Sequence, residues 1–342
     1  MRPRFLTALL TAAALLSACS PLPEPPPPLE QQTAPALHQA QNRAQAPAGP
    51  PLPAGSVFED ADNVPPATPE TEEVVGSLRP DDATPEERVP EILERGRLIV
   101  GIDQSQNLLS FRNPVTSQLE GFEVDLAREI ARDVFDNSNA VDFRFIEAGE
   151  RESALLKGTV DVVISTMSIT QDRQEILEFS TPYMNSDVRL LTVQGSGVRT
   201  YEDLTGETVC IAEGSTSLEH ARLHASDSQL LLTRRWSDCL MALQQNQADA
   251  IISDDTVLSG IAAQDPFTHL TGASVGQEHY GVAIAKESEK HDTEGLVRQV
   301  NSTMERIRRD GTWWTMFDRW FGPYLTSLGP PDLQYREEPT DE

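Results

Sequence analysis

Arginine side chains are the residues through which this chain could bind an anion. Acidic residues outnumber basic ones by 54 to 27 among 342 residues, a formal net charge of −27. An anionic ligand therefore needs cationic groups concentrated at its site. Arg173 follows Ser168–Thr170 at a predicted strand-to-helix junction, where hydroxyls, backbone N–H groups and a helix N-terminus converge on a carboxylate. The alternative is a surface arginine paired with Asp172 or Glu175.

Three more polar segments follow predicted strands. Glu213–Ser217 opens a predicted helix, so its backbone amides could bind an anion. The alternative is a capped helix N-terminus without a ligand. Asp254 and Asp255 follow the strand 250–253, where a carboxylate would pair with an ammonium or cap the next helix. Asp103 ends the first strand in the same way.

The elements that must position these residues form a repeated βαβαβ pattern. Strands are predicted at 98–102, 141–145, 160–165, 209–212, 230–232 and 250–253, and helices at 123–135, 153–157, 218–224, 238–245, 293–309 and 312–320. The pattern predicts two α/β units with mostly parallel sheets, which bind ligands in a cleft at the carboxyl ends of strands. Val188–Val193 and Tyr280–Ala285 are candidates for the crossing segments. The aromatic residues between Trp313 and Phe321 are predicted to pack in the core.

The first 19 residues indicate export. Arg2 and Arg4 precede an apolar stretch, 5–16, that is too short to span a bilayer. Leu16–Cys19 resembles the bacterial lipobox, which implies that Cys19 is lipidated and becomes the mature N-terminus. The alternative is an ordinary signal peptide with a chance cysteine. The protein is thus expected outside the cytoplasm, anchored to the membrane by lipid.

Composition divides the remainder of the chain. Residues 20–90 hold most of the 25 prolines and are predicted to be a disordered tether. Residues 329–342 are predicted to be a polar tail. Cys210 and Cys239 are expected to form a disulfide in an oxidising compartment, with two buried thiols as the alternative. No histidine–cysteine cluster predicts a metal site, no cofactor is expected, and the acidic balance argues against nucleic acid.

From about Arg95 to Phe321 the chain resembles the family 3 solute-binding proteins of polar amino-acid transporters. The resemblance rests on four blocks: Leu98–Asp103, Leu119–Leu126, Val160–Tyr183 and Gly311–Gly322. It implies a periplasmic-binding-protein type II fold, two α/β lobes around a ligand cleft (a Venus flytrap). The domain would span 91–328, with lobe one at about 91–187 and 286–328 and lobe two at about 188–285.

The resemblance also implies roles for single residues. Arg173 would grip the α-carboxylate of an amino acid, and Ser168 and Ser165 would hold its carboxylate and ammonium through hydroxyl and carbonyl groups. The site would be completed by Thr166 in the same turn, by Thr216 with the neighbouring Ser215 for the α-carboxylate, and by Asp254, or Asp255 if the match is off by one, for the ammonium. Asp103 is a weaker candidate of the same kind.

Arg151 bears on substrate choice. Gly149–Leu156 resembles the segment whose arginine meets the side-chain carboxylate in glutamate and aspartate binders; a helix-start arginine bridging Glu150 or Glu152 is the alternative. The sequence departs from the family at Gln104–Asn107, where an aromatic usually packs on the ligand, and at Ser253, where some relatives carry a histidine. These departures leave ligand size and the ranking of acids and amides open.

We therefore expect a monomeric protein that captures glutamate or aspartate, with asparagine or glutamine as further candidates, and delivers it to an ABC permease. One alternative is a sensor domain that signals to a membrane partner. Another is an enzyme, because the fold also hosts a dehydratase, although no catalytic constellation stands out.

Overall fold

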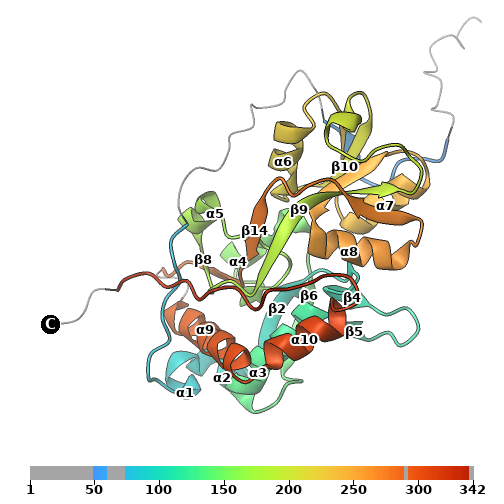
Figure 1. The fold of residues 1–342 in the computed structure, drawn as a ribbon. Coiled ribbons are helices and arrows are strands. Elements are labelled where there is room, and N and C mark those ends of the chain that lie inside the picture. The colour runs from blue at the N-terminus through green and yellow to red at the C-terminus, as the bar shows by residue number, and fades with distance from the viewer. Residues whose placement is uncertain (1–48, 60–73, 289–291, 339–342) are drawn as a thin grey trace, which may run out of the picture. The chain divides into compact units, whose positions relative to one another are not determined.

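The computed structural model describes residues 49–59, 74–288 and 292–338. Those from Pro50 onward form one compact unit, drawn in Figure 1. Within these ranges, no helix is long and apolar enough to cross a membrane. The predicted signal peptide, Cys19 and residues 20–48 of the predicted tether lie outside the described residues.

Lobe one contains a five-stranded sheet in the order β6-β2-β7-β15-β8. The strands are β2 (Leu98–Ile102), β6 (Val141–Phe145), β7 (Val162–Val163), β8 (Leu177–Phe179) and β15 (Ala283–Ala285). Its helices are α1 (Pro85–Arg88), α2 (Pro90–Arg95), α3 (Phe122–Phe135), α4 (Arg151–Leu156), α5 (Gln171–Ile176), α9 (Glu294–Arg309) and α10 (Thr312–Trp320). Strand β2 runs parallel to β6 and β7, as the βαβαβ pattern predicts.

The C-terminal helices complete the core of lobe one. Helix α3 packs against α9 and α10, and these helices lie together in Figure 1. The rings of Trp313, Phe317 and Phe321 are buried, and Phe122 of α3 packs against Trp313 and Phe321. The prediction that this aromatic stripe packs in the core is correct for these three rings, whereas Trp314 is partly exposed.

Lobe two contains a seven-stranded sheet in the order β1-β11-β10-β12-β9-β13, with β14 also paired to β9. The strands are β1 (Val57–Phe58), β9 (Met184–Val193), β10 (Thr208–Ala212), β11 (Gln229–Thr233), β12 (Ala250–Asp254), β13 (Thr268–Thr271) and β14 (Gln277–Tyr280). Its helices are α6 (Ser217–His224), α7 (Trp236–Gln244) and α8 (Asp255–Gln264). The described residues also include two pieces of 3-10 helix, Ala148–Glu150 and Glu202–Leu204. A small sheet, β3 (Ser105–Gln106), β4 (Ser110–Arg112) and β5 (Leu119–Glu120), follows β2.

The chain passes between the lobes through β9 and the segment around β14. Residues 184–187 at the start of β9 pair with β14, and the rest of β9 pairs with β12 and β13 of lobe two. The crossing therefore begins a few residues before the predicted Val188. Strand β15 belongs to the sheet of lobe one, so the predicted lobe-two boundary at 285 is too late.

The predicted tether is too long, because its described parts pack on both lobes. Strand β1 pairs antiparallel with β11 at the edge of the lobe-two sheet, and Glu59 forms an ion pair with Arg222. The side chain of Gln247 donates a hydrogen bond to the carbonyl of Pro50 at 2.7 Å. Edge pairing satisfies backbone groups of a proline-rich segment without requiring a core of its own.

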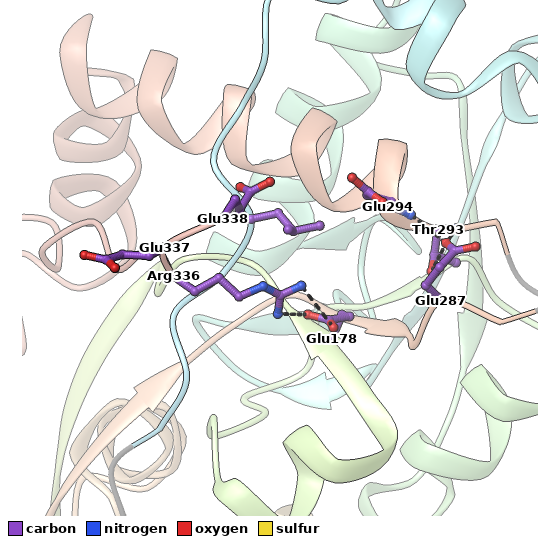
Figure 2. A pocket seen from close by; sticks show the side chains of 8 residues that line it. Glu178, Glu287, Thr293, Glu294, Arg336, Glu337 and Glu338 are labelled. Carbon is purple, nitrogen blue, oxygen red and sulfur yellow. Dashed lines mark hydrogen bonds and ion pairs between the residues drawn. The ribbon is translucent and has the colours of Figure 1, made fainter. Parts of the chain in front are cut away.

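Residues 74–90 and the C-terminal segment pack together on lobe one. Ser77 pairs with Tyr335, Leu78 is buried, and the Tyr335 hydroxyl donates to Glu305 at 3.0 Å. Figure 2 shows Arg336 of this segment directed at Glu178, 2.9 Å away. The prediction of a polar tail from residue 329 is therefore wrong for the described residues up to 338, where ion pairs and backbone pairing hold the chain.

Cys210 and Cys239 form the predicted disulfide. Their Cα atoms lie 5.5 Å apart, and both residues are fully buried. The bond links strand β10 to helix α7 across 29 residues of sequence. The alternative of two buried thiols is thereby excluded.

We expect loss of this disulfide to lower the free energy of unfolding by about 2–4 kcal/mol, because the closed loop restricts the unfolded chain. Urea titrations with and without a reductant measure the effect. The Cys210→Ala/Cys239→Ala variant is the control: its unfolding midpoint should not respond to the reductant. Equal midpoints for the wild type with and without reductant would contradict the expectation.

Candidate functional site

A small cavity between the lobes brings together most of the predicted site residues. Lobe one contributes Ala148, Arg151, Thr166, Ser168 and Arg173, and lobe two contributes Ser215, Thr216, Trp236 and Asp254. The cavity lies where loops follow β7, β10 and β12, at the carboxyl ends of these strands, as the strand order predicts.

Arg151 opens α4 and is 4 % exposed. Its guanidinium donates hydrogen bonds to the carbonyls of Ala148 at 2.9 Å, Ser165 at 2.8 Å and Gly214 at 2.9 Å. Within the described part of the chain it forms no ion pair, so backbone dipoles orient its charge without neutralising it. The predicted alternative, a bridge to Glu150 or Glu152, does not form.

Arg173 lies in the first turn of α5, which Thr170 caps by accepting the Arg173 backbone N–H at 3.3 Å. Its guanidinium donates to the carbonyl of Ser168 at 2.8 Å and to that of Gly214 at 3.2 Å. The half-exposed carboxylate of Glu152 lies 3.6 Å from its Nε and forms an ion pair with it. Both cavity arginines thus reach the same lobe-two carbonyl.

The two guanidiniums make the cavity electropositive. Burial, followed by the positive charge of Arg173, lowers the pKa of Arg151 to about 10. Arg151 is still protonated at neutral pH, so two like charges face one small space. An anion placed between them would offset their repulsion and their desolvation.

The lobe-two loop before α6 approaches lobe one closely. Gly214 has a φ of +76°, and a Cβ there would lie 2.9 Å from the Cα of Gly149. The Ser168 and Thr216 hydroxyls, from opposite lobes, are 3.3 Å apart. This proximity corresponds to a closed cleft, so ligand exchange requires the lobes to separate.

Asp254 ends β12 and is 5 % exposed. One carboxylate oxygen accepts the Tyr280 hydroxyl, and the other, Oδ1, has no hydrogen-bond partner among the described residues. Burial, followed by the nearby Glu278, raises the pKa of Asp254 well above its ordinary value. Asp255 instead accepts the Ser186 hydroxyl at 2.6 Å and does not line the cavity.

Two predicted site residues do not line the cavity. Asp103 accepts the Ser105 hydroxyl at 2.7 Å and holds the turn after β2. Ser165 contributes its carbonyl, which orients Arg151. Asp103 is therefore placed as a turn residue, and Ser165 as a support for Arg151.

Sequence reasoning missed two residues that matter to the site. Trp236, at the start of α7 and 5 % exposed, gives the cavity an aromatic wall from lobe two. Glu123 is fully buried behind the cavity, where its Oε1 accepts the Thr166 backbone N–H at 2.6 Å and the Tyr183 hydroxyl at 2.7 Å. A tryptophan preceding a predicted helix was a usable signal, whereas Glu123 is indistinguishable from a surface glutamate in the sequence.

No group of three histidine, cysteine or acidic side chains in residues 49–59, 74–288 and 292–338 is placed to hold a metal ion.

Two α/β lobes and a charged interlobe cavity define a two-lobed ligand-binding protein. The chain belongs to the bacterial extracellular solute-binding proteins, family 3, whose pattern matches residues 98–323. The predicted family and the periplasmic-binding-protein type II fold are thereby confirmed.

Curated relatives are named as binding proteins. The chain is 27 % identical to the ABC transporter glutamine-binding protein GlnH of Bacillus subtilis over 67 % of this chain and 82 % of that protein. It is 30 % identical to the glutamate-binding protein GluB of Corynebacterium efficiens, over 72 % of this chain and 84 % of that protein. Among solved structures, holo ArgBP from T. maritima superposes with a TM-score of 0.58 at 28 % identity, over 68 % of this chain and 99 % of that one.

Glu123 should make stability depend on pH. Burial raises its pKa from 4.5 to about 7, so the folded protein holds this proton more tightly than the unfolded chain does. Stability from this group is complete below about pH 4.5 and is lost as pH rises towards 7, by up to about 3 kcal/mol. We expect the Glu123→Gln variant, whose amide oxygen can accept the same two hydrogen bonds, to lack this loss.

Denaturant titrations of both proteins at several pH values between 4 and 8 measure the difference. Parallel stability curves for the wild type and Glu123→Gln would contradict the expected shift.

Proposed function

We propose that this protein binds an acidic amino acid, glutamate or aspartate, in the interlobe cavity. The observation that carries the proposal is the charge pattern of that cavity: two buried guanidiniums and one carboxylate with an unpartnered oxygen. An acidic amino acid carries two carboxylates and one ammonium, which is the complementary set. A neutral amino acid would leave one guanidinium without an anion, and a basic one would add a like charge.

In this proposal Arg173 binds the α-carboxylate, together with the Ser168 hydroxyl and the amides near Ser215 and Thr216. Its fork-shaped guanidinium matches a carboxylate in bidentate fashion. The Glu213–Ser217 loop precedes α6, an eight-residue helix whose N-terminal N–H groups favour negative charge. Because Arg173 and Ser168 belong to lobe one and Ser215 and Thr216 to lobe two, a carboxylate bound by all four would bridge the lobes.

Arg151 binds the side-chain carboxylate, and Asp254 binds the ammonium through Oδ1. The Thr166 carbonyl, beside the cavity, is a further acceptor for the ammonium. Backbone carbonyls orient Arg151 but leave its charge for the ligand, so replacing a ligand carboxylate by an amide would leave a buried cation underpaired.

The protein would carry its ligand to an ABC transporter in the membrane. GlnH of Bacillus subtilis, named as an ABC transporter protein, supports this role. Leu16–Cys19 supports lipidation at Cys19, which would hold a monomeric domain at the outer face of the cell membrane. The closed form would dock on the permease and release the amino acid when the lobes open.

Calorimetric titration of L-glutamate, L-aspartate, L-glutamine and L-asparagine tests the ligand class, after unfolding and refolding to remove carried-over ligand. We expect the acids to bind more tightly than the amides, and Arg151→Ala to weaken acid binding at least 10-fold with a smaller effect on the amides. Arg144→Ala, which removes an exposed arginine paired with Asp142, is the matched control and should leave the Kd unchanged. Tighter binding of the amides by the wild type would refute the role of Arg151.

Membrane anchoring has a separate test. We expect Cys19→Ala to move the protein from the membrane fraction to the soluble fraction, because a single cysteine carries the acyl chains. Cell fractionation followed by immunoblotting measures this, with Cys210→Ala/Cys239→Ala as a control that keeps Cys19. Retention of Cys19→Ala in the membrane fraction would exclude lipidation as the anchor.

A further inference from the structure

The two lobes also touch outside the cavity, through the turn that follows β3. Strand β3 of lobe one packs against α7 and α8 of lobe two, and α8 lies next to this small sheet in Figure 1. Asn107, directly after β3, donates a hydrogen bond from its side-chain amide to the carbonyl of Gly260 in α8 at 3.3 Å. Neither residue lines the cavity, so this contact joins the lobes without the ligand.

Gly260 allows the turn and the helix to approach to backbone contact. It is buried in the middle of α8, and a Cβ there would lie 2.2 Å from the carbonyl oxygen of Asn107 and 3.1 Å from its carbonyl carbon. Close-packed atoms do not overlap to this extent, so a residue with a Cβ would push the turn away from α8. Glycine is a poor residue for the helix alone, and what it provides here is the contact between the lobes.

The turn that carries Asn107 has a strained backbone. Leu108 has a φ of +69°, in the left-handed region that bulky residues rarely adopt. Its side chain is buried, and its carbonyl accepts the backbone N–H of Phe122 in α3 at 2.9 Å. Because α3 belongs to lobe one, lobe one itself holds the strained turn and presents Asn107 to α8.

Another contact across the cleft is an ion pair, in which Arg235, just before α7, lies 2.6 Å from Glu147 of lobe one. The two side chains are 46 % and 25 % exposed. Exposed pairs contribute little because water and salt screen them and both side chains can rotate away. The Asn107 carbonyl cannot rotate away from Gly260 in this manner, so the backbone contact limits closure more strictly than the ion pair does.

We infer that Asn107 and Gly260 are positioning residues whose contact determines how completely the lobes close, and thereby sets the affinity for every ligand of the cavity without selecting among them. The inference rests on the proposed function, in which a bound amino acid bridges the lobes. The apparent Kd of a ligand equals its intrinsic Kd divided by the fraction of protein that reaches the binding-competent state. A contact made only in the closed form raises that fraction by the same factor for every ligand that needs the same closure.

The Gly260→Ala variant of the full-length chain separates closure from folding. Alanine favours a helix, so the ligand-free variant should unfold at the same temperature as the wild type or higher. The added methyl group meets Asn107 only when the lobes close. We therefore expect the Kd of each amino acid that binds the wild type to rise at least 10-fold, by factors that agree within about 3-fold, and its dissociation rate to increase. Calorimetry, stopped-flow fluorescence and thermal unfolding measure these changes.

A distance between the lobes reports closure directly. Spin labels at Lys157→Cys in lobe one and Ser226→Cys in lobe two, both at exposed positions, give this distance by pulsed electron paramagnetic resonance. With saturating ligand, we expect the distance in Gly260→Ala to lie between those of the ligand-free and the saturated wild type.

A mutant cycle with Asn107→Ala provides a second, milder change. This variant loses the hydrogen bond but keeps the backbone contact, so we expect the Kd to rise about 2- to 5-fold. In the Gly260→Ala background the same change should alter the Kd less than about 2-fold, because the contact is already separated. Asn139→Ala is the matched control: Asn139 precedes β6, at the end of the sheet opposite the cavity, and its change should leave the Kd unaltered.

The outcomes are separable. An unchanged Kd in Gly260→Ala, equal losses for Asn107→Ala in both backgrounds, or a loss confined to one amino acid overturns the positioning role while the proposed function stands. A lower unfolding temperature of ligand-free Gly260→Ala also overturns it, because the methyl group would then clash within lobe two. A wild type that binds none of the four amino acids overturns the proposed function, and this inference falls with it.

Discussion

The carbonyl oxygen of Gly214 accepts hydrogen bonds from both Arg151 and Arg173. This one backbone group of lobe two lies between two cations of lobe one and so joins the two lobes at the cavity, just before α6. The contact requires a close approach of backbones, which the positive φ of Gly214 and the small Gly149 permit. Because a carbonyl has no net charge, this contact by itself neutralises neither arginine; Glu152 lies 3.6 Å from the Nε of Arg173.

Each lobe also has a buried carboxyl group that accepts a hydrogen bond from a tyrosine next to a crossing strand. Tyr183, just before β9, donates to Glu123 of lobe one, and Tyr280, at the end of β14, donates to Asp254 of lobe two. The two rings lie 6.0 Å apart. Each lobe thus carries one carboxylate tied to the segment about which the lobes move, so the polar groups of the site are supported by the same strands that allow closure.

Periodicity and strand order predicted the elements that place the site. Arg173 and Asp254 each follow a buried strand, and the carboxyl ends of such strands meet at one edge, so their convergence was predictable. The pairing of β1 with β11 was not predictable from the sequence. It joins Val57 and Leu232, which are far apart in sequence, through backbone groups that every residue type except proline has. Glu123 was missed for another reason: a buried carboxylate differs from a solvated one only in its neighbours, which a local pattern does not contain.

The burial of the cavity cations also has a kinetic consequence. With a net charge of −27, the chain repels an acidic amino acid at long range, and the attraction of Arg151 and Arg173 acts only inside the cleft. Dissolved salt screens the first effect over a Debye length of about 8 Å at physiological ionic strength but reaches the enclosed charges much less. If the ligand is an acidic amino acid, as proposed, its capture should become faster as ionic strength rises, the reverse of the dependence found where surface charge steers a ligand inward.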